Sequence, residues 1–216
     1  MRVVVVASAD LDPSDGSWLD GADLVIAADG GAGSLDRIGR LPDLLVGDLD
    51  SVEPALAERL AAAGVVVERH PTDKDGSDTE LAVEAAFGAG ATEVVLLGAF
   101  GGSRIDHELA NVLLLADPAL AGRQVRAVRA ATQVRALGGG GRIDLAGGLG
   151  ATVTLLPVGG DAGGVTTEGL RWPLSDATLG FGRSRGLSNE VVSPPASVRI
   201  EHGTLLVIET AREESK

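Results

Sequence analysis

Two hydrophobic periodicities alternate along the first 135 residues, and this alternation constrains the fold more than any other feature of the sequence. Short aliphatic and β-branched runs predict strands, and apolar residues three or four positions apart predict helices between them. Strands alternating with helices of about 10–15 residues form βαβ units and a mostly parallel sheet. The expected strands are residues 2–7, 24–28, 44–46, 65–68, 93–97 and 124–128, and the expected helices are 54–63, 78–87 and 105–116.

The pattern changes after Ala131. Residues 138–141 are four consecutive glycines, which predict a turn or a flexible joint. Beyond them, Gly or Pro clusters separate short strands expected at 142–146, 152–157, 165–168, 197–201 and 204–209, with His202 and Gly203 as a hairpin turn. The sequence therefore predicts an α/β domain with a mostly parallel sheet over residues 1–135, followed by an all-β, sandwich-like domain over residues 136–216.

Charge and composition exclude several classes of function. The chain has 31 acidic and 18 basic residues, a net charge of -13, so its surface repels nucleic acids and anionic membranes. It has no cysteine, which excludes disulfides, thiolate zinc sites and cysteine nucleophiles. No stretch approaches the ~20 apolar residues of a membrane span, and the first apolar run is too short for a signal peptide. We therefore expect a cytoplasmic protein.

Asp48 and Asp50 follow the expected strand 44–46 directly. In an extended chain, residues i and i+2 point to the same side, so both carboxylates would face one point beyond the strand. Mg²⁺ is the usual cation for such oxygen ligands when a phosphate ester is the substrate. The alternative is a polar turn, in which aspartate is common.

The segment 71–80 carries acids around a lysine, before an expected helix. Ser77 and Glu80 fit a capping box, which is a structural role. Capping does not explain Asp73 and Asp75 on either side of Lys74, in a chain whose only other lysine is Lys216. An ammonium among acids before a helix suits a phosphate held by both a lysine and a metal.

Two glycine-rich turns follow other strands. Gly101 and Gly102 precede Arg104 and Asp106, a sequence that suits an anion held by backbone N–H groups and a guanidinium, with helix capping as the alternative. Asp29-Gly30-Gly31 follows the strand 24–28 and matches neither a Walker A loop nor GxGxxG. Since all these segments follow strands of one parallel sheet, we expect them at one sheet edge. Together they fit a magnesium–nucleoside triphosphate.

These segments, in this order, resemble the thiamine pyrophosphokinase (thiamine diphosphokinase) family. The resemblance rests on Asp29-Gly30-Gly31, residues 47–51, 73–78 and 101–107, and Gly186-Leu187-Ser188-Asn189. It implies a homodimer whose α/β nucleotide-binding domain precedes a β-sandwich that binds thiamine. The implied reaction is the Mg²⁺-dependent transfer of diphosphate from ATP to the thiamine hydroxyl, which gives thiamine diphosphate and AMP.

The resemblance also implies roles for individual residues. Asp48, Asp50 and Asp78 would be metal ligands, and Lys74, Arg104 and Asp106 would be catalytic. Ser103 is an extra residue between the glycines and Arg104. The contacts to ATP would come from Asp29, Gly30, Gly31, Asp73, Asp75, Gly101 and Gly102.

Thiamine is a cationic aromatic molecule, so an aromatic ring and hydrogen-bond acceptors are expected around it. Trp172 matches a family segment and is the candidate ring, with core packing as the alternative. Ser188 and Asn189 are candidates for the pyrimidine edge, or form a turn.

Three other functions remain open at this level. They are a diphosphotransferase acting on a pterin alcohol, a plain kinase that releases ADP, and a non-catalytic thiamine or nucleotide sensor.

Overall fold

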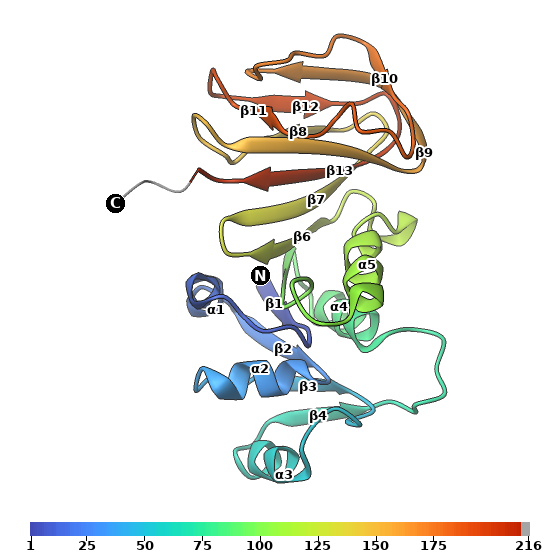
Figure 1. Cartoon of the computed structure of the whole chain (residues 1–216). Coiled ribbons are helices and arrows are strands. Elements are labelled where there is room, and N and C mark those ends of the chain that lie inside the picture. The colour runs from blue at the N-terminus through green and yellow to red at the C-terminus, as the bar shows by residue number, and fades with distance from the viewer. Residues whose placement is uncertain (213–216) are drawn as a thin grey trace. The chain divides into compact units, whose positions relative to one another are not determined.

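The computed structural model describes residues 1–212 and divides into two compact units (Figure 1). The first contains Met1–Leu114 and Arg123–Ala130, and the second contains Leu115–Gly122 and the chain from Ala131 onward. The four-glycine turn therefore lies inside the second unit. No helix within residues 1–212 is long and apolar enough to cross a membrane.

The first unit is built on a parallel sheet, as the sequence predicts. Its strand order is β4-β3-β2-β1-β5-β6, and every neighbouring pair in it is parallel. The central strands are buried on both faces, which explains their continuous apolar runs. The strands are β1 (Arg2–Val6), β2 (Leu24–Ala28), β3 (Leu44–Gly47), β4 (Val66–Arg69), β5 (Glu93–Leu97) and β6 (Gln124–Arg129).

Helices cover both faces of this sheet (Figure 1). On one face lie α1 (Gly16–Asp20), α2 (Gly31–Arg37) and α3 (Pro54–Ala62), whose Leu19, Leu35 and Leu60 pack in one cluster with Val4 and Val6 of β1. On the other lie α4 (Asp78–Gly88), which contacts β1, β2 and β3, and α5 (Ile105–Leu114). Two single-turn 3₁₀ helices are Pro13–Asp15 and Pro118–Leu120.

Helix α5 differs from its prediction in the face that it buries. The helical periodicity places the apolar residues Leu109 and Leu113 on one side of the helix, yet they are 56% and 52% exposed, while Asn111 is buried. The Asn111 amide donates to the carbonyl of Ala99 at 3.0 Å, so a polar contact joins the buried side of this helix to the turn after β5.

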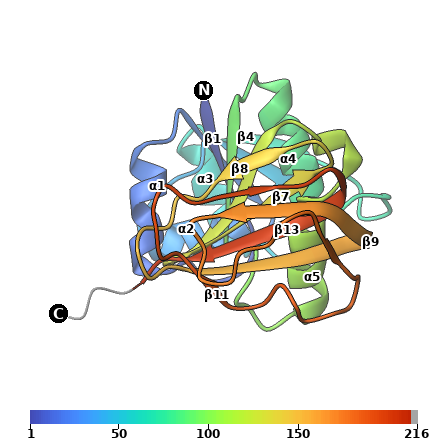
Figure 2. The same ribbon diagram turned by 90° about the horizontal axis from the view of Figure 1, so that it is seen from above.

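The second unit is antiparallel, with strand order β7-β13-β9-β12-β8 and with β10 and β11 paired to β9. Figures 1 and 2 show β9 and β13 running side by side. Inward side chains of these strands form one apolar cluster, as expected for a sandwich-like domain. The strands are β7 (Thr132–Gly138), β8 (Arg142–Asp144), β9 (Thr152–Glu168), β10 (Ala177–Leu179), β11 (Asn189–Glu190), β12 (Ser197–Arg199) and β13 (His202–Thr210).

Two local predictions for this unit were wrong. The strands expected at 152–157 and 165–168 are one strand, β9, in which Gly159 and Gly160 adopt φ values of 73° and 151°. His202 and Gly203 are not a hairpin turn, because β12 and β13 each pair with β9 rather than with each other. Gly203 instead allows close packing, since a Cβ there would lie 2.4 Å from the carbonyl oxygen of Asp161.

Candidate functional site

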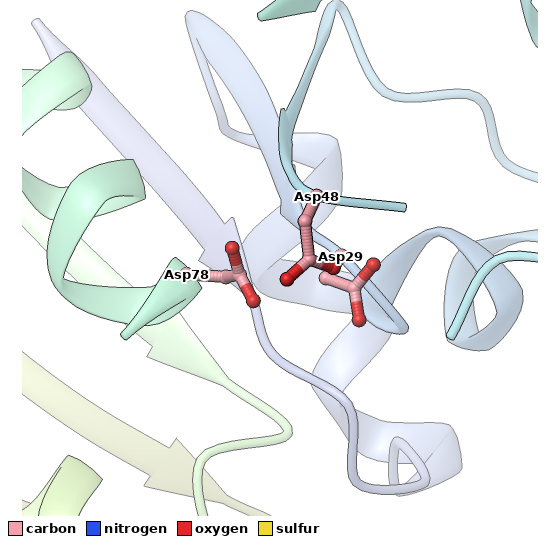
Figure 3. Close-up of side chains that lie close together, drawn as sticks. All are labelled: Asp29, Asp48 and Asp78. Atoms are coloured by element: carbon pink, nitrogen blue, oxygen red, sulfur yellow. The ribbon is translucent and has the colours of Figure 1, made fainter. Parts of the chain in front are cut away.

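Three carboxylates meet at the carboxyl edge of the parallel sheet (Figure 3). Asp29 follows β2, Asp48 follows β3, and Asp78 is the first residue of α4. One oxygen of each side chain lies within 4.8 Å of the other two. Because β2 and β3 are parallel neighbours, their ends deliver Asp29 and Asp48 to the same place.

Glycines make this close approach possible. Gly31 lies so close to β1 that a Cβ on it would be 1.9 Å from the Val6 carbonyl oxygen. Gly47 has φ 149°, and a Cβ on it would lie 3.0 Å from both the Asp29 Cβ and the Asp78 Oδ1. The glycines next to these acids therefore leave room for the backbone and for the carboxylates themselves.

Asp78 reaches the cluster because α4 starts at this edge and then packs over β3, β2 and β1. The predicted capping box is confirmed: Ser77 accepts from the N–H of Glu80 at 3.2 Å, and Glu80 accepts from the N–H of Ser77 at 2.9 Å. These bonds fix where the helix begins and hence where Asp78 lies.

Asp29 is the most buried of the three acids, with 5% of its surface exposed. Its Oδ1 is buried and has no hydrogen-bond partner. Burial raises the pKa of Asp29, the negative charges of Asp78 and Asp50 raise it further, and a hydrogen bond from Ser51 opposes them. The structure thus holds a buried carboxylate oxygen with an unused acceptor site, which costs free energy unless a cation faces it.

Lys74 supplies positive charge at this cluster. Its Nζ donates to Asp78 Oδ1 at 2.6 Å and contacts Asp48 Oδ2 at 3.4 Å. Burial lowers the pKa of Lys74, but the hydrogen bond and the charges of Asp78 and Asp48 outweigh it and raise the pKa above its ordinary value. Asp73 and Asp75 are exposed on either side of Lys74 and are not among the three clustered acids.

The extended geometry expected for residues 48–50 was wrong. Leu49 has φ 69°, and the N–H of Asp50 donates back to Asp48 Oδ1 at 3.0 Å, so the chain turns immediately after β3. This bond is the main reason why the pKa of Asp48 lies below its ordinary value. Asp50 lies outside the group of three, and Asp29 stands in it instead. The signal for Asp29 was its position directly after a buried strand.

The donor set fits a hard divalent cation. Carboxylate oxygens are the ligands that Mg²⁺ prefers, and it is bound in proteins through one or two of them together with substrate phosphates. The unpartnered Oδ1 of Asp29 is the observation that favours a cation here over an ordinary polar turn.

The glycine-rich turn after β5 is held by an arginine that the sequence patterns did not single out. Arg129, at the end of β6, donates through Nη1 to the carbonyls of Asp10 at 2.9 Å and Phe100 at 3.3 Å. Gly101 has φ 88°, and a Cβ there would lie 2.5 Å from the Arg129 guanidinium. Gly102 is exposed beside it. The sequence signal that could have indicated Arg129 is its position at the end of a strand of this sheet.

Arg104 and Asp106 form an exposed ion pair with each other. Arg104 Nε lies 2.9 Å from Asp106 Oδ1, and Nη2 lies 2.5 Å from Oδ2. These bonds hold the pKa of Asp106 far below its ordinary value. A carboxylate stabilised in this way is a weak base, so this arrangement favours a role in orientation over proton abstraction.

The second unit presents its candidate residues together. Trp172 is 59% exposed, which excludes the core-packing alternative. Asn189 in β11 holds the Trp172 backbone: its Oδ1 accepts from the Trp172 N–H at 3.1 Å, and its Nδ2 donates to the Trp172 carbonyl at 2.8 Å. Ser188, at φ 56°, is exposed beside them, and its N–H donates to Thr154 Oγ1 at 3.0 Å. The Asn189 amide therefore positions the tryptophan.

Models of two protein families match the chain. Residues 16–127 match the family described as thiamin pyrophosphokinase, catalytic domain. Residues 142–205 match thiamin pyrophosphokinase, vitamin B1 binding domain. The two matches fall in the α/β part and the all-β part, respectively.

Relatives and solved structures agree with these matches. The thiamine pyrophosphokinase of Bacillus subtilis (strain 168) is 23% identical over 209 residues, 96% of this chain and 97% of that protein. Thiamine pyrophosphokinase 3 of Oryza sativa subsp. japonica is 27% identical over 87% of this chain and 78% of its own.

Crystal structures show the same fold. That of the Bacillus subtilis thiamine pyrophosphokinase has a TM-score of 0.86 at 23% identity and covers 98% of this chain and 99% of its own. That of the thiamin pyrophosphokinase from Geobacillus thermodenitrificans has a TM-score of 0.81 at 25% identity and covers 99% of each chain. With both family models matched in order, the chain belongs to the thiamine pyrophosphokinase family.

Proposed function

We propose that this protein transfers the diphosphate group of ATP to the hydroxyl of thiamine, giving thiamine diphosphate and AMP. The hydroxyl oxygen forms a bond to the β-phosphorus, the bond from that phosphorus to the α–β bridging oxygen breaks, and AMP leaves with that oxygen. The hydroxyl proton is released. The single observation that carries the proposal is the carboxylate cluster with its unpartnered Asp29 oxygen, in a chain that matches both family domains.

Asp29, Asp48 and Asp78 would hold a magnesium ion, with Asp50 beside them. When bound, the ion would neutralise phosphate charge. The support is their mutual distance and the effect of the Asp50 charge on Asp29. Asp73 and Asp75 are exposed and would contact ATP from the flanking loop.

The remaining residues of the first unit would bind and orient the triphosphate. Lys74 and Arg104 supply positive charge for the transferred group and for the leaving AMP. Asp106, kept ionised by Arg104, would orient the thiamine hydroxyl. The turns at Gly30-Gly31 and Gly101-Gly102 allow the chain to pass close to phosphates, where positioning matters more than strong base catalysis.

The second unit would bind thiamine through the exposed Trp172 ring. A cationic aromatic ligand gains from stacking on an indole. Asn189 holds the tryptophan backbone in place, and the exposed Ser188 would offer its hydroxyl to the pyrimidine edge.

The test is product analysis with purified protein, ATP, Mg²⁺ and thiamine. We expect AMP and thiamine diphosphate in equal amounts, and no AMP after chelation of the metal. ADP with thiamine monophosphate would indicate a plain kinase, and turnover only with a pterin alcohol would identify a different acceptor. Binding without turnover would make the protein a sensor. Each of these results would refute the proposal.

A homodimer and a cytoplasmic location complete the proposal. The homodimer is implied by the family resemblance, and the cytoplasmic location is the expectation drawn from the sequence. Sedimentation of the purified protein and localisation of a tagged chain test them.

A further inference from the structure

Lys74 lies against two of the three clustered carboxylates. Its Nζ lies 2.6 Å from Asp78 Oδ1 and 3.4 Å from Asp48 Oδ2, and its side chain is 15% exposed. The ammonium thus serves two of the three clustered carboxylates, while Asp29 keeps its buried, unpartnered Oδ1.

An ammonium and a divalent cation compete for these carboxylates at such short range. The two positive charges repel each other strongly in a partly buried site, where water screens them poorly. Each carboxylate oxygen also loses acceptor capacity when it already takes a charge-assisted hydrogen bond. Cation binding therefore weakens the hold of Lys74 on these carboxylates and favours its release from at least one of them.

The segment that carries Lys74 has no regular secondary structure. Residues 72–76 contain only bends and irregular backbone, and both neighbours of Lys74, Asp73 and Asp75, are exposed. Ser77 then closes the capping box of α4, so the helix start stays fixed while the lysine segment changes.

We propose that Lys74 is an exchangeable counter-ion of the metal site. Without metal it neutralises Asp48 and Asp78 and keeps the acid cluster from expanding. When a divalent cation binds, Lys74 leaves these carboxylates and its ammonium becomes available to the nucleotide phosphates. The inference rests on the proposed function, since it takes the acid cluster as the cation site.

The first test is metal binding by the full-length protein without ATP or thiamine, with Mn²⁺ as the probe. If Lys74 holds the carboxylates about 90% of the time, Lys74→Met should bind Mn²⁺ about tenfold more tightly than wild type. Lys74→Arg keeps the positive charge, so its Mn²⁺ affinity should stay near that of wild type. Arg59→Met, which removes an exposed ion pair with Asp36, controls for net charge and should leave Mn²⁺ affinity unchanged.

The second test uses the scarcity of lysine. Only Lys74 and Lys216 carry side-chain amines, so mass spectrometry resolves acetylation of each, with Lys216 as the reference for reagent strength. Adding Mg²⁺ should raise the acetylation rate of Lys74 relative to Lys216 by up to about tenfold. The reason is that the fraction of Lys74 free of the carboxylates would rise from about 10% to nearly all of it.

Two results would overturn the inference. One is Mn²⁺ affinity in Lys74→Met that equals or falls below that of wild type, including no binding by either protein. The other is Lys74 acetylation that Mg²⁺ leaves unchanged or slows. Both measurements omit the substrates, so a wild-type protein that makes no AMP would refute the proposed function while leaving these results to stand.

Discussion

Asp29→Asn should make the metal-free protein more stable and the enzyme inactive. Asp29 is 5% exposed, its Oδ1 has no partner, and Asp78 and Asp50 repel it. A buried unsatisfied polar group costs about 1–3 kcal/mol. Asparagine removes the charge but keeps one oxygen without a donor. We therefore expect the free energy of unfolding to rise by about 1 kcal/mol, the lower end of this range. For a chain of this size, that gain corresponds to a rise in Tm of about 2–4 °C.

The stability that Asp29→Asn gains over wild type should depend on pH, and the raised pKa of Asp29 determines the direction of that dependence. Because the pKa of Asp29 is raised in the folded state, the folded protein binds more protons than the unfolded chain between the two pKa values. The wild type therefore gains stability as the pH falls through the raised pKa. The advantage of Asp29→Asn is full above that pKa, shrinks as the pH falls, and vanishes below the ordinary aspartate pKa of about 3.9.

Thermal unfolding followed by circular dichroism, in EDTA at pH 8 and at pH 5, measures this difference. Asp36→Asn, an exposed acid on α2 that pairs with Arg59, is the matched control and should change stability by less than about 0.5 kcal/mol. Mg²⁺ should stabilise the wild type but not Asp29→Asn. AMP formation should fall by at least about 100-fold, given that supporting residues of metal sites alone cost 10–100-fold. A variant less stable than wild type in EDTA at pH 8, or one that keeps its activity, would refute the reasoning.

Further variants test other parts of the structure. Asp50→Ala should abolish Mg²⁺-dependent AMP formation without lowering Tm, because the side chain is exposed; near wild-type rates would remove Asp50 from the site. Gly31→Ala should cost about 3 kcal/mol or more in urea unfolding, as its Cβ would lie 1.9 Å from a carbonyl oxygen, whereas Gly33→Ala in the same helix has room and should be neutral or stabilising. Trp172→Ala should raise the KM for thiamine about tenfold with little change in the KM for ATP. The variant Trp18→Phe keeps Trp172 as its only tryptophan, so thiamine should still quench its tryptophan fluorescence. An unquenched signal would contradict stacking of thiamine on Trp172.

Local patterns predicted most of the first unit because its central strands are continuous apolar runs. Glu93–Leu97 and Leu24–Ala28 have the predicted bounds. Helix α2 was missed because Gly31 and Gly33 make its sequence a poor helix former. Its formation depends on packing against β1 and β2, which outweighs the local preference.

Two predictions from local sequence patterns were wrong for the same reason. Leu109 and Leu113 indicate a packed face of α5, yet both are exposed, while Asn111, which bonds to the Ala99 carbonyl, is buried. Gly203 suggests a tight hairpin turn, yet it is needed where another strand passes close by. In both cases the deciding partner is distant in the sequence.

The sequence by itself determined the parallel sheet, the antiparallel second domain, the acids at the strand ends and the capping box before α4. These features depend on residues within a few positions of one another, whose relation the backbone sets. Only the tertiary structure decided that Asp29, rather than Asp50, joins Asp48 and Asp78, and that Lys74 lies across two of these acids. Those groups come from separate segments and meet because the order β3-β2-β1 and the path of α4 bring their ends together. Strand order and helix path are properties of the whole unit rather than of any one motif.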